Sequence, residues 1–218
     1  DVALTGDDKA DYQLGSGSAT TTATIDKRDV TASITAAGKT YDGNDGATID
    51  SCSLEAQAGN HGVVSPDAVG CAGSNGHFAN KHAGANKAVS ADVALTGDDK
   101  ADYQLTSANA STTASIAQRS VTASISAADK TYDGSDAATI TGCSLEAQAG
   151  NHGIVSPDAV GCTGSNGHFA NKHAGANKAV SADVALTGGD KADYQLTSSS
   201  AATTATIEQR PVTASISA

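Results

Sequence analysis

The chain repeats itself every 91 residues. The segment VALTGDDKADYQL begins at Val2 and at Val93, and a copy with one change begins at Val184. When 30–120 is aligned with 121–211, no gap is needed and 15 of the 91 positions differ. Solenoids and propellers have repeats of about 20–50 residues, whereas about 90 residues are enough for a self-contained β-sandwich. We therefore predict separate domains in tandem, arranged as an elongated rod.

The period divides the chain into four parts. Residues 1–29 correspond to the C-terminal part of a preceding repeat, and 30–120 and 121–211 are full β repeats. Residues 212–218 correspond to the first strand of the next repeat. We therefore expect an internal piece of a longer protein, whose targeting signals lie elsewhere.

The composition favours thin β structure over a deep globular core. The chain has no Met or Trp, two Phe and five Tyr, so Val, Ile, Leu and Ala must supply most of the buried surface. Apolar and polar residues alternate at the start of the repeat, where Val30, Ala32 and Ile34 share one face. We predict an all-β fold made of tandem Ig-like β-sandwich repeats.

Turns rich in Gly, Asn and Asp separate the expected strands of the first full repeat. These strands lie at 30–34, 47–54, 69–78, 87–95, 103–105 and 112–116. One helical turn is expected at 65–68, with Ser65 as its N-cap and Pro66 at its first position.

The connection between repeats, 116–121, contains no flexible Gly/Ser linker. A short extended connection restrains neighbouring domains, so we expect a stiff rod. Its length should grow by about 35–45 Å with each repeat, judged from the rise of a β-strand.

The net charge argues against a nucleic acid partner. Lys and Arg number 13 against 24 Asp and Glu, which gives a formal charge of −11. An acidic surface repels phosphate backbones and anionic lipids. The apolar runs are far shorter than the roughly 20 residues of a membrane helix, so we also expect no membrane insertion in this segment.

Each full repeat has two cysteines at the same spacing. They are Cys52 with Cys71 and Cys143 with Cys162. Paired cysteines in an acidic chain of secreted character predict one disulfide within each repeat, worth roughly 3 kcal/mol on the chain-entropy model. Free or intermolecular thiols are one alternative. Metal ligation is another, although the sequence has no C-x-x-C spacing.

Acidic and histidine residues raise the question of a metal site. Asp92, Asp98, Asp99 and Asp102 could supply oxygen ligands to calcium, but they lack the EF-hand spacing, and turn-forming aspartates explain them as well. We therefore expect no cofactor, with calcium as the alternative. The three histidines of the repeat, at 61, 77 and 82, are interpreted as solvated loop residues, with a transition-metal site as the alternative.

Several spaced motifs resemble those of a known family. Tyr-Asp-Gly occurs at 41–43 and 132–134, and a G-x-F-x-x-K-x-x-G-x-x-K-x-V pattern begins at Gly76. Leu-Thr-Gly and Ala-Asp-Tyr-Gln-Leu follow in order. Over essentially its whole length the chain resembles the YDG-type repeats of large bacterial surface adhesins, which are similar to bacterial Ig-like MBG modules. The resemblance implies an extracellular stalk module at the bacterial cell surface and supplies no catalytic residues.

Two functional hypotheses follow. The first is a structural stalk or spacer of an extracellular bacterial adhesin or surface filament, which projects a distal adhesive region or builds a fibre. The second is a multivalent module in which each repeat binds glycan or ice weakly, so that repetition raises avidity. Sugar binding usually needs exposed aromatic rings, whereas Tyr41, Phe78 and Tyr103 are expected in the core.

The sequence gives no support to catalysis. It contains no G-x-S-x-G elbow or other ordered triad signature, so we expect that the protein is not an enzyme. The expected partners are neighbouring repeats of the same protein. The incomplete repeats at 1–29 and 212–218 leave end-to-end self-association open as a further interaction.

Overall fold

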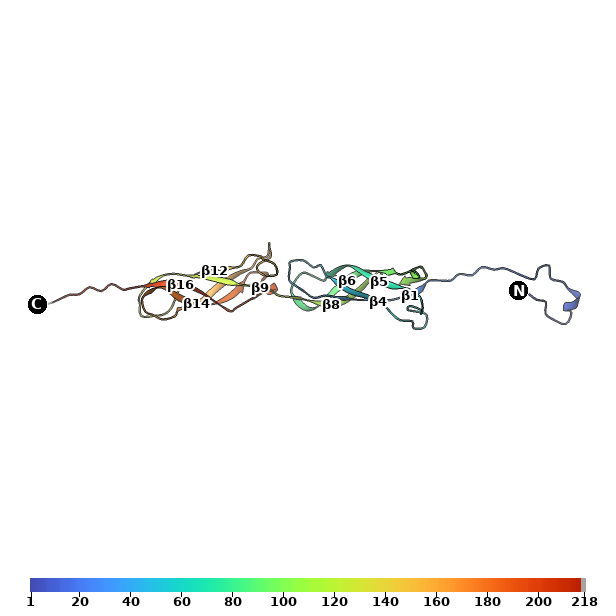
Figure 1. The fold of residues 1–218 in the computed structure, drawn as a ribbon, viewed down its shortest axis with the longest axis horizontal. Coiled ribbons are helices and arrows are strands. Elements are labelled where there is room, and N and C mark those ends of the chain that lie inside the picture. The colour runs from blue at the N-terminus through green and yellow to red at the C-terminus, as the bar shows by residue number, and fades with distance from the viewer. Residues whose placement is uncertain (217–218) are drawn as a thin grey trace.

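The computed structural model describes residues 1–216 and contains two β domains in tandem. The domains lie end to end, and the two terminal segments extend away from them in opposite directions (Figure 1). Ser217 and Ala218, the last residues of the predicted final strand, lie outside the described part. Within that part, none of the helices has the length and apolar character needed to span a membrane.

Repeat 1, which spans 28–117 in the structure, contains strands and one 3-10 turn. Its elements are β1 (Arg28–Val30), β2 (Ala32–Ala36), β3 (Lys39–Thr40), β4 (Ile49–Leu54), β5 (Gly70–Phe78), β6 (Gly84–Thr96), the 3-10 turn η2 (Lys100–Asp102), β7 (Tyr103–Leu105) and β8 (Asn109–Ala117).

Repeat 2 has the same elements in the same order. They are β9 (Arg119–Val121), β10 (Ala123–Ala127), β11 (Lys130–Thr131), β12 (Ile140–Leu145), β13 (Gly161–Phe169), β14 (Gly175–Thr187), η3 (Lys191–Asp193), β15 (Tyr194–Leu196) and β16 (Ser200–Glu208). Outside the repeats, 1–27 contain one further 3-10 turn, η1 (Lys9–Asp11), and 211–216 contain no strand.

Each repeat pairs its strands in the same way. In repeat 1 the order β3-β8-β6-β5 forms a four-stranded sheet, while β2 pairs with β4 and β1 pairs with β7. At Thr31, which separates β1 from β2, the chain passes from the pair formed with β7 to the pair formed with β4. The long central strand β6 has 13 residues, which corresponds to about 43 Å at the rise of a β-strand.

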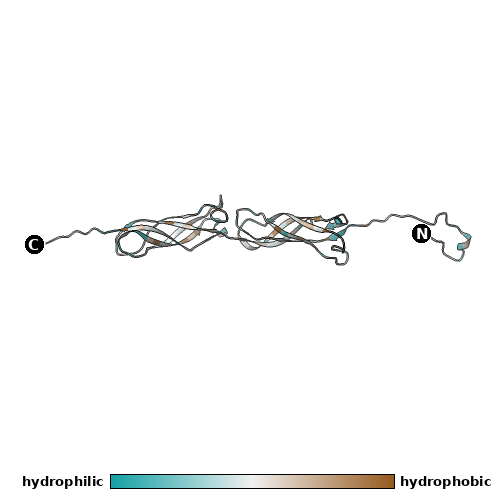
Figure 2. Cartoon of the chain, viewed as in Figure 1, coloured by the Kyte–Doolittle hydropathy of each residue, from teal (hydrophilic) through white to brown (hydrophobic). Residues whose placement is uncertain are grey.

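The apolar faces of these sheets pack against each other. Ile34 on β2 contacts Ala91 and Val93 on β6, and Ile49 and Leu105 pack beside them. Hydrophobic residues, drawn in brown, lie along the strands of both repeats (Figure 2). This arrangement confirms the all-β prediction of tandem repeats.

One disulfide links the two sheets in each repeat. Cys52 on β4 is bonded to Cys71 on β5, and Cys143 is bonded to Cys162 in the same positions of repeat 2. The Cα atoms of each pair lie 5.6 Å apart, a normal distance for a disulfide. The predicted pairing is confirmed, and two disulfides indicate that the protein folds in an oxidising compartment.

Some local predictions differ from the structure. Residues 65–68 do not form the predicted helical turn; they belong to a tight turn in which the N–H of Asp67 donates to the carbonyl of Val64. The short strand β3 was not expected, since its two residues are too few to show a periodic pattern.

Candidate functional site

Several hydrogen bonds link the two repeats at the junction between them. Gln118 is the only residue between β8 and β9, and its side-chain amide donates to the carbonyl of Ala192 (2.9 Å). The next residue, Arg119, is only 2% exposed. Its guanidinium donates to the carbonyls of Gly153 (2.8 Å) and His152 (2.8 Å) in repeat 2 and, at 3.3 Å, to that of Tyr41 in repeat 1.

Tyr41 reaches from repeat 1 into repeat 2. Its backbone N–H donates to the carbonyl of Ala117 at the end of β8, which fixes its position beside the connection. Its hydroxyl donates to Oδ2 of Asp158 (2.7 Å). Its ring meets that of Tyr194 edge to face, with centroids 5.5 Å apart. The Tyr41 side chain, fully buried, therefore belongs to a core shared by both repeats.

Asp158 receives hydrogen bonds from both repeats. Tyr194 of its own repeat donates to Oδ2 (2.7 Å), and Lys81 of repeat 1 donates to Oδ1 (3.2 Å). Burial works to raise the pKa of Asp158, but the hydrogen bonds from Tyr194, Tyr41 and Lys81 outweigh it and lower the pKa below its ordinary value. The carboxylate is therefore held in its charged form between the two domains.

The same carboxylate affects the two phenols. Burial and the hydrogen bond to Asp158 raise the pKa of Tyr41 and of Tyr194 well above the ordinary value. Both hydroxyls therefore stay protonated as hydrogen-bond donors over a wide range of pH.

A second carboxylate forms a separate contact across the junction. One carboxylate oxygen of Asp193 accepts a hydrogen bond from the backbone N–H of Ala83 (2.7 Å), and the other lies 2.8 Å from Nδ1 of His82. The Asp193 side chain is only 3% exposed. The junction thus has two bonded points, at Asp158 and Asp193, in addition to the covalent connection.

The turn that carries Tyr41 explains the Tyr-Asp-Gly motif. Oδ1 of Asp42 accepts hydrogen bonds from the backbone N–H of Asn44 (3.1 Å) and from the Lys39 ammonium (2.8 Å), which closes the turn. Gly43 has a φ of +84°, and a Cβ atom there would lie 3.0 Å from Cγ1 of Val155 in repeat 2. The motif therefore supplies a side chain that crosses the junction, a turn cap, and a residue small enough for the neighbour to approach.

A comparison with protein families finds two tandem matches to one family model. The YDG domain matches residues 26–114 and again residues 117–205. The chain belongs to the YDG domain family. Among curated proteins, none matches the chain significantly. Each YDG match begins four residues before the repeat boundary predicted from the sequence.

Each YDG repeat has a donor tip at one end and an acceptor site at the other. The donor tip of repeat 1 consists of Tyr41, Lys81, His82 and Ala83, and that of repeat 2 consists of Tyr132, Lys172, His173 and Ala174. The acceptor site of repeat 2 consists of Arg119, Asp158, Asp193 and Tyr194, and that of repeat 1 consists of Arg28, Asp67, Asp102 and Tyr103. The internal junction joins the donor tip of repeat 1 to the acceptor site of repeat 2.

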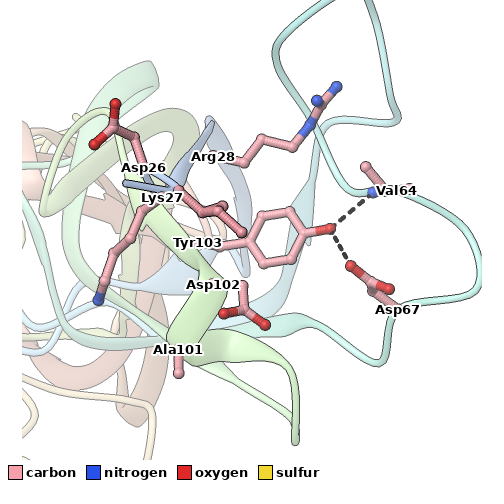
Figure 3. Close-up of a pocket in the computed structure, with 9 residues that line it drawn as sticks. Asp26, Lys27, Arg28, Val64, Asp67, Ala101, Asp102 and Tyr103 are labelled. Atoms are coloured by element: carbon pink, nitrogen blue, oxygen red, sulfur yellow. Dashed lines mark hydrogen bonds between the residues drawn. The ribbon is translucent and has the colours of Figure 1, made fainter. Parts of the chain in front are cut away.

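The acceptor site of repeat 1 faces an open cavity of about 460 Å³. The hydroxyl of Tyr103 donates to Oδ2 of Asp67 (2.6 Å) and accepts from the backbone N–H of Val64 (3.1 Å) (Figure 3). Arg28 donates to the carbonyl of Gly62 (2.7 Å). The wall of the cavity also includes Asp102 and residues 25–27.

The proposed calcium ligands have different surroundings. Asp92 accepts hydrogen bonds from the side-chain amides of Asn75 (2.7 Å) and Asn109 (3.2 Å). Asp99 accepts from the backbone N–H of Ala68, Asp98 is exposed, and Asp102 borders the cavity. Residues 1–216 contain no cluster of three or more His, Cys, Asp or Glu arranged to hold a metal ion. Asp92 and Asp99 therefore act as hydrogen-bond acceptors in separate parts of the repeat.

His82 is an exposed loop residue, as predicted, and its Nδ1 also lies 2.8 Å from Oδ2 of Asp193 in the next repeat. Tyr41 is buried in a core, as predicted, but that core is shared by both repeats. The sequence reasoning did not foresee these contacts between repeats. The sequence did contain a signal for this placement. Successive turns between antiparallel strands lie at opposite ends of a domain, and this order puts 41–43 and 80–84 at the end where the chain passes into the next repeat.

Proposed function

We propose that the chain is part of the stalk of an extracellular bacterial adhesin or surface filament, in which YDG repeats act as rigid spacers. The observation that carries the proposal is the junction, where a single residue separates the last strand of one repeat from the first strand of the next. Such a stalk projects a distal adhesive region from the cell or forms the body of a fibre.

The side chains around the connection support stiffness. Bending at a flexible linker costs little, because only backbone rotation is involved. Bending here would separate Tyr41 from Asp158 and His82 from Asp193, and it would expose the buried guanidinium of Arg119. Hydrogen bonds to charged groups contribute about 1.5–3 kcal/mol each, so several contacts oppose any change of angle.

The length of the repeat supports the role of a spacer. The central strand of 13 residues accounts for about 43 Å of length, and the two repeats lie end to end along one line (Figure 1). Each further repeat joined in the same way would add about the same distance.

The surroundings of the aromatic residues favour a spacer over a glycan-binding module. Phe78 is fully buried, Tyr41 is buried in the junction, and Tyr103 is 3% exposed. Rings that stack on sugars must present a face to solvent. The proposed role involves neither catalysis nor a cofactor, and the disulfides suit a protein that works outside the cell.

Small-angle X-ray scattering on chains with two, three and four full repeats would test the proposal. The maximum dimension should rise by about 40 Å per repeat, as expected for domains of this strand length in line. A length that grows with the square root of repeat number would indicate flexible joints and would contradict the rigid spacer. In the full-length surface protein, in-frame removal of repeats should shorten the projection seen by electron microscopy by the same step.

A further inference from the structure

Asp193 is a buried carboxylate that obtains its hydrogen bonds from the neighbouring repeat. Its side chain is 3% exposed. Within residues 1–216, the carboxylate contacts Nδ1 of His82 (2.8 Å) and the backbone N–H of Ala83 (2.7 Å), both in repeat 1. A buried carboxylate without such partners carries a large desolvation cost. The contact at Asp193 therefore forms and breaks together with the junction.

The imidazole of His82 can make this contact in two protonation states. Nδ1 donates to a carboxylate when the ring is neutral with its hydrogen on Nδ1, and also when the ring is positively charged. The charged ring adds the attraction between two opposite charges at hydrogen-bond distance. The His82 side chain is 55% exposed, so the ring can exchange its proton with solvent while it stays in contact with Asp193. Protonation therefore changes the strength of the contact.

Histidine is the residue type at the junction that ordinarily titrates near neutral pH. The ordinary pKa values of Asp, Lys, Arg and Tyr lie outside the range of about pH 5.5–8, whereas that of His lies inside it. Asp158 has a lowered pKa, Tyr41 and Tyr194 have raised ones, and the hydrogen bond to Asp158 raises the pKa of Lys81, so all four lie further from that range. A second histidine, His152, bonds Arg119 through its backbone carbonyl, and its residue is exposed. The charged and titratable residues around His82 are thus Tyr41 and Lys81 of repeat 1 and Arg119, His152, Asp158, Asp190, Lys191, Asp193 and Tyr194 of repeat 2.

The charges around the donor tip leave Asp193 to pair with His82. The hydrogen bond to Asp158 and the charges of Asp158, Asp190 and Asp193 raise the pKa of Lys81, the residue next to His82. Lys81 repels a positive charge on His82, but its ammonium is itself paired with Asp158 at 3.2 Å. The carboxylate of Asp193 contacts no other side chain of residues 1–216 by a hydrogen bond.

We propose that His82 and Asp193 form a pH-dependent clamp between the repeats, in which protonation of the imidazole strengthens the junction. The added attraction is present below the pH at which the imidazole loses its proton and is lost as the pH rises through that value. Acidification from about pH 8 to about pH 5.5 therefore holds the two repeats together more tightly. The inference rests on the proposed stalk and deepens it, because it makes the stiffness of the spacer respond to the surroundings. His173 of repeat 2 and Asp102 of repeat 1 occupy the equivalent positions, so repeats joined in the same way would respond over the same range.

Hydrogen exchange of the Ala83 amide in the two-repeat chain would test the proposal. This N–H donates to Asp193, so it exchanges when the contact opens. The measured rates are corrected for the pH dependence of exchange in an unfolded peptide. The protection of the Ala83 amide should then be about two- to fivefold higher at about pH 5.5 than at about pH 8, the factor that a partly exposed ion pair contributes.

The variant His82→Asn removes the charge and keeps a donor. The amide nitrogen of Asn and Nδ1 of His are both bonded to Cγ, so a neutral hydrogen bond to Asp193 can still form. This variant should retain protection of the Ala83 amide at about pH 8 and lose the gain at about pH 5.5. The matched controls His152→Asn and His173→Asn change exposed histidines whose side chains form no hydrogen bond with residues 1–216, and both should keep the gain.

Two results would overturn the clamp alone. One is equal protection of the Ala83 amide at the two pH values, which would leave the stalk proposal standing because the junction would still be closed. The other is a gain that His82→Asn retains, since another group would then be responsible. An Ala83 amide that exchanges as fast as in an unfolded peptide at both pH values would contradict the closed junction itself, and with it both the clamp and the rigid spacer.

Discussion

The contribution of the internal junction to stability can be measured by removing one oxygen atom. Tyr41→Phe keeps the ring that packs against Tyr194 and deletes the hydroxyl that donates to Asp158. A hydrogen bond to a charged group contributes about 1.5–3 kcal/mol. Because Asp158 keeps its bonds to Tyr194 and Lys81, we expect the free energy of unfolding to fall by about 2 kcal/mol, within that range.

Urea denaturation at micromolar concentration is a suitable assay. For a slope of about 2 kcal/mol per M, a loss of about 2 kcal/mol lowers the midpoint by about 1 M. The matched control is Tyr132→Phe, the same substitution at the equivalent residue of repeat 2, whose hydroxyl forms no hydrogen bond with residues 1–216. The control should shift the midpoint by less than about 0.3 M, the change expected for a surface substitution.

Equal shifts for the two variants would refute this reasoning. They would mean that the hydrogen bond from the Tyr41 hydroxyl to Asp158 stabilises the folded chain no more than a hydrogen bond from that hydroxyl to water. A lowered slope in Tyr41→Phe alone would instead show that the repeats unfold separately once the bond is lost, as expected for domains coupled only through their interface.

Three other predictions follow from the same structure. The coupling of the repeats, followed by calorimetry, should weaken as the pH falls below about 4, where carboxyls of the unfolded chain take up protons, and should be lost at the lower pH at which Asp158, with its lowered pKa, is protonated. It should also weaken above about pH 10, where unfolded tyrosines ionise but the two junction tyrosines with raised pKa do not; a flat profile would contradict the prediction. Replacing Cys52 and Cys71 by Ser should destabilise repeat 1 by roughly 3 kcal/mol relative to the oxidised parent chain, and reduction of the parent should destabilise repeat 1 by the same amount. Gly43→Ala should destabilise the chain more than Gly134→Ala in thermal melts: both glycines have positive φ, but only at Gly43 does a Cβ atom approach the next repeat.

The sequence was sufficient to predict most of the fold. The repeat period located the two domains, and alternation located strands that have one buried face, although the predicted strand at 30–34 is divided between β1 and β2 at Thr31. The cysteine spacing predicted both disulfides. These features depend on local patterns or on pairing within one repeat, and such patterns remain visible in a single chain.

The junction was harder to predict, because its residues resemble ordinary turn and core residues. Tyr41 precedes Asp-Gly, a common turn pair, and nothing in this spacing shows that the ring points toward another domain. Lys81, His82 and Asp158 lie in loops rich in small polar residues. Their meeting depends on the angle between two folded domains, and no periodicity in the sequence encodes that angle.

The single residue between β8 and β9 also determines how a longer array would be shaped. When every junction uses the same residues, each repeat is related to the next by one fixed rotation and one fixed translation. Applying such an operation many times generates a helix of constant pitch, in the way that heterologous contacts generate filaments. Every copy of a given surface loop then lies on a regular spiral around the axis, so a small error in one junction angle would be multiplied along the whole array.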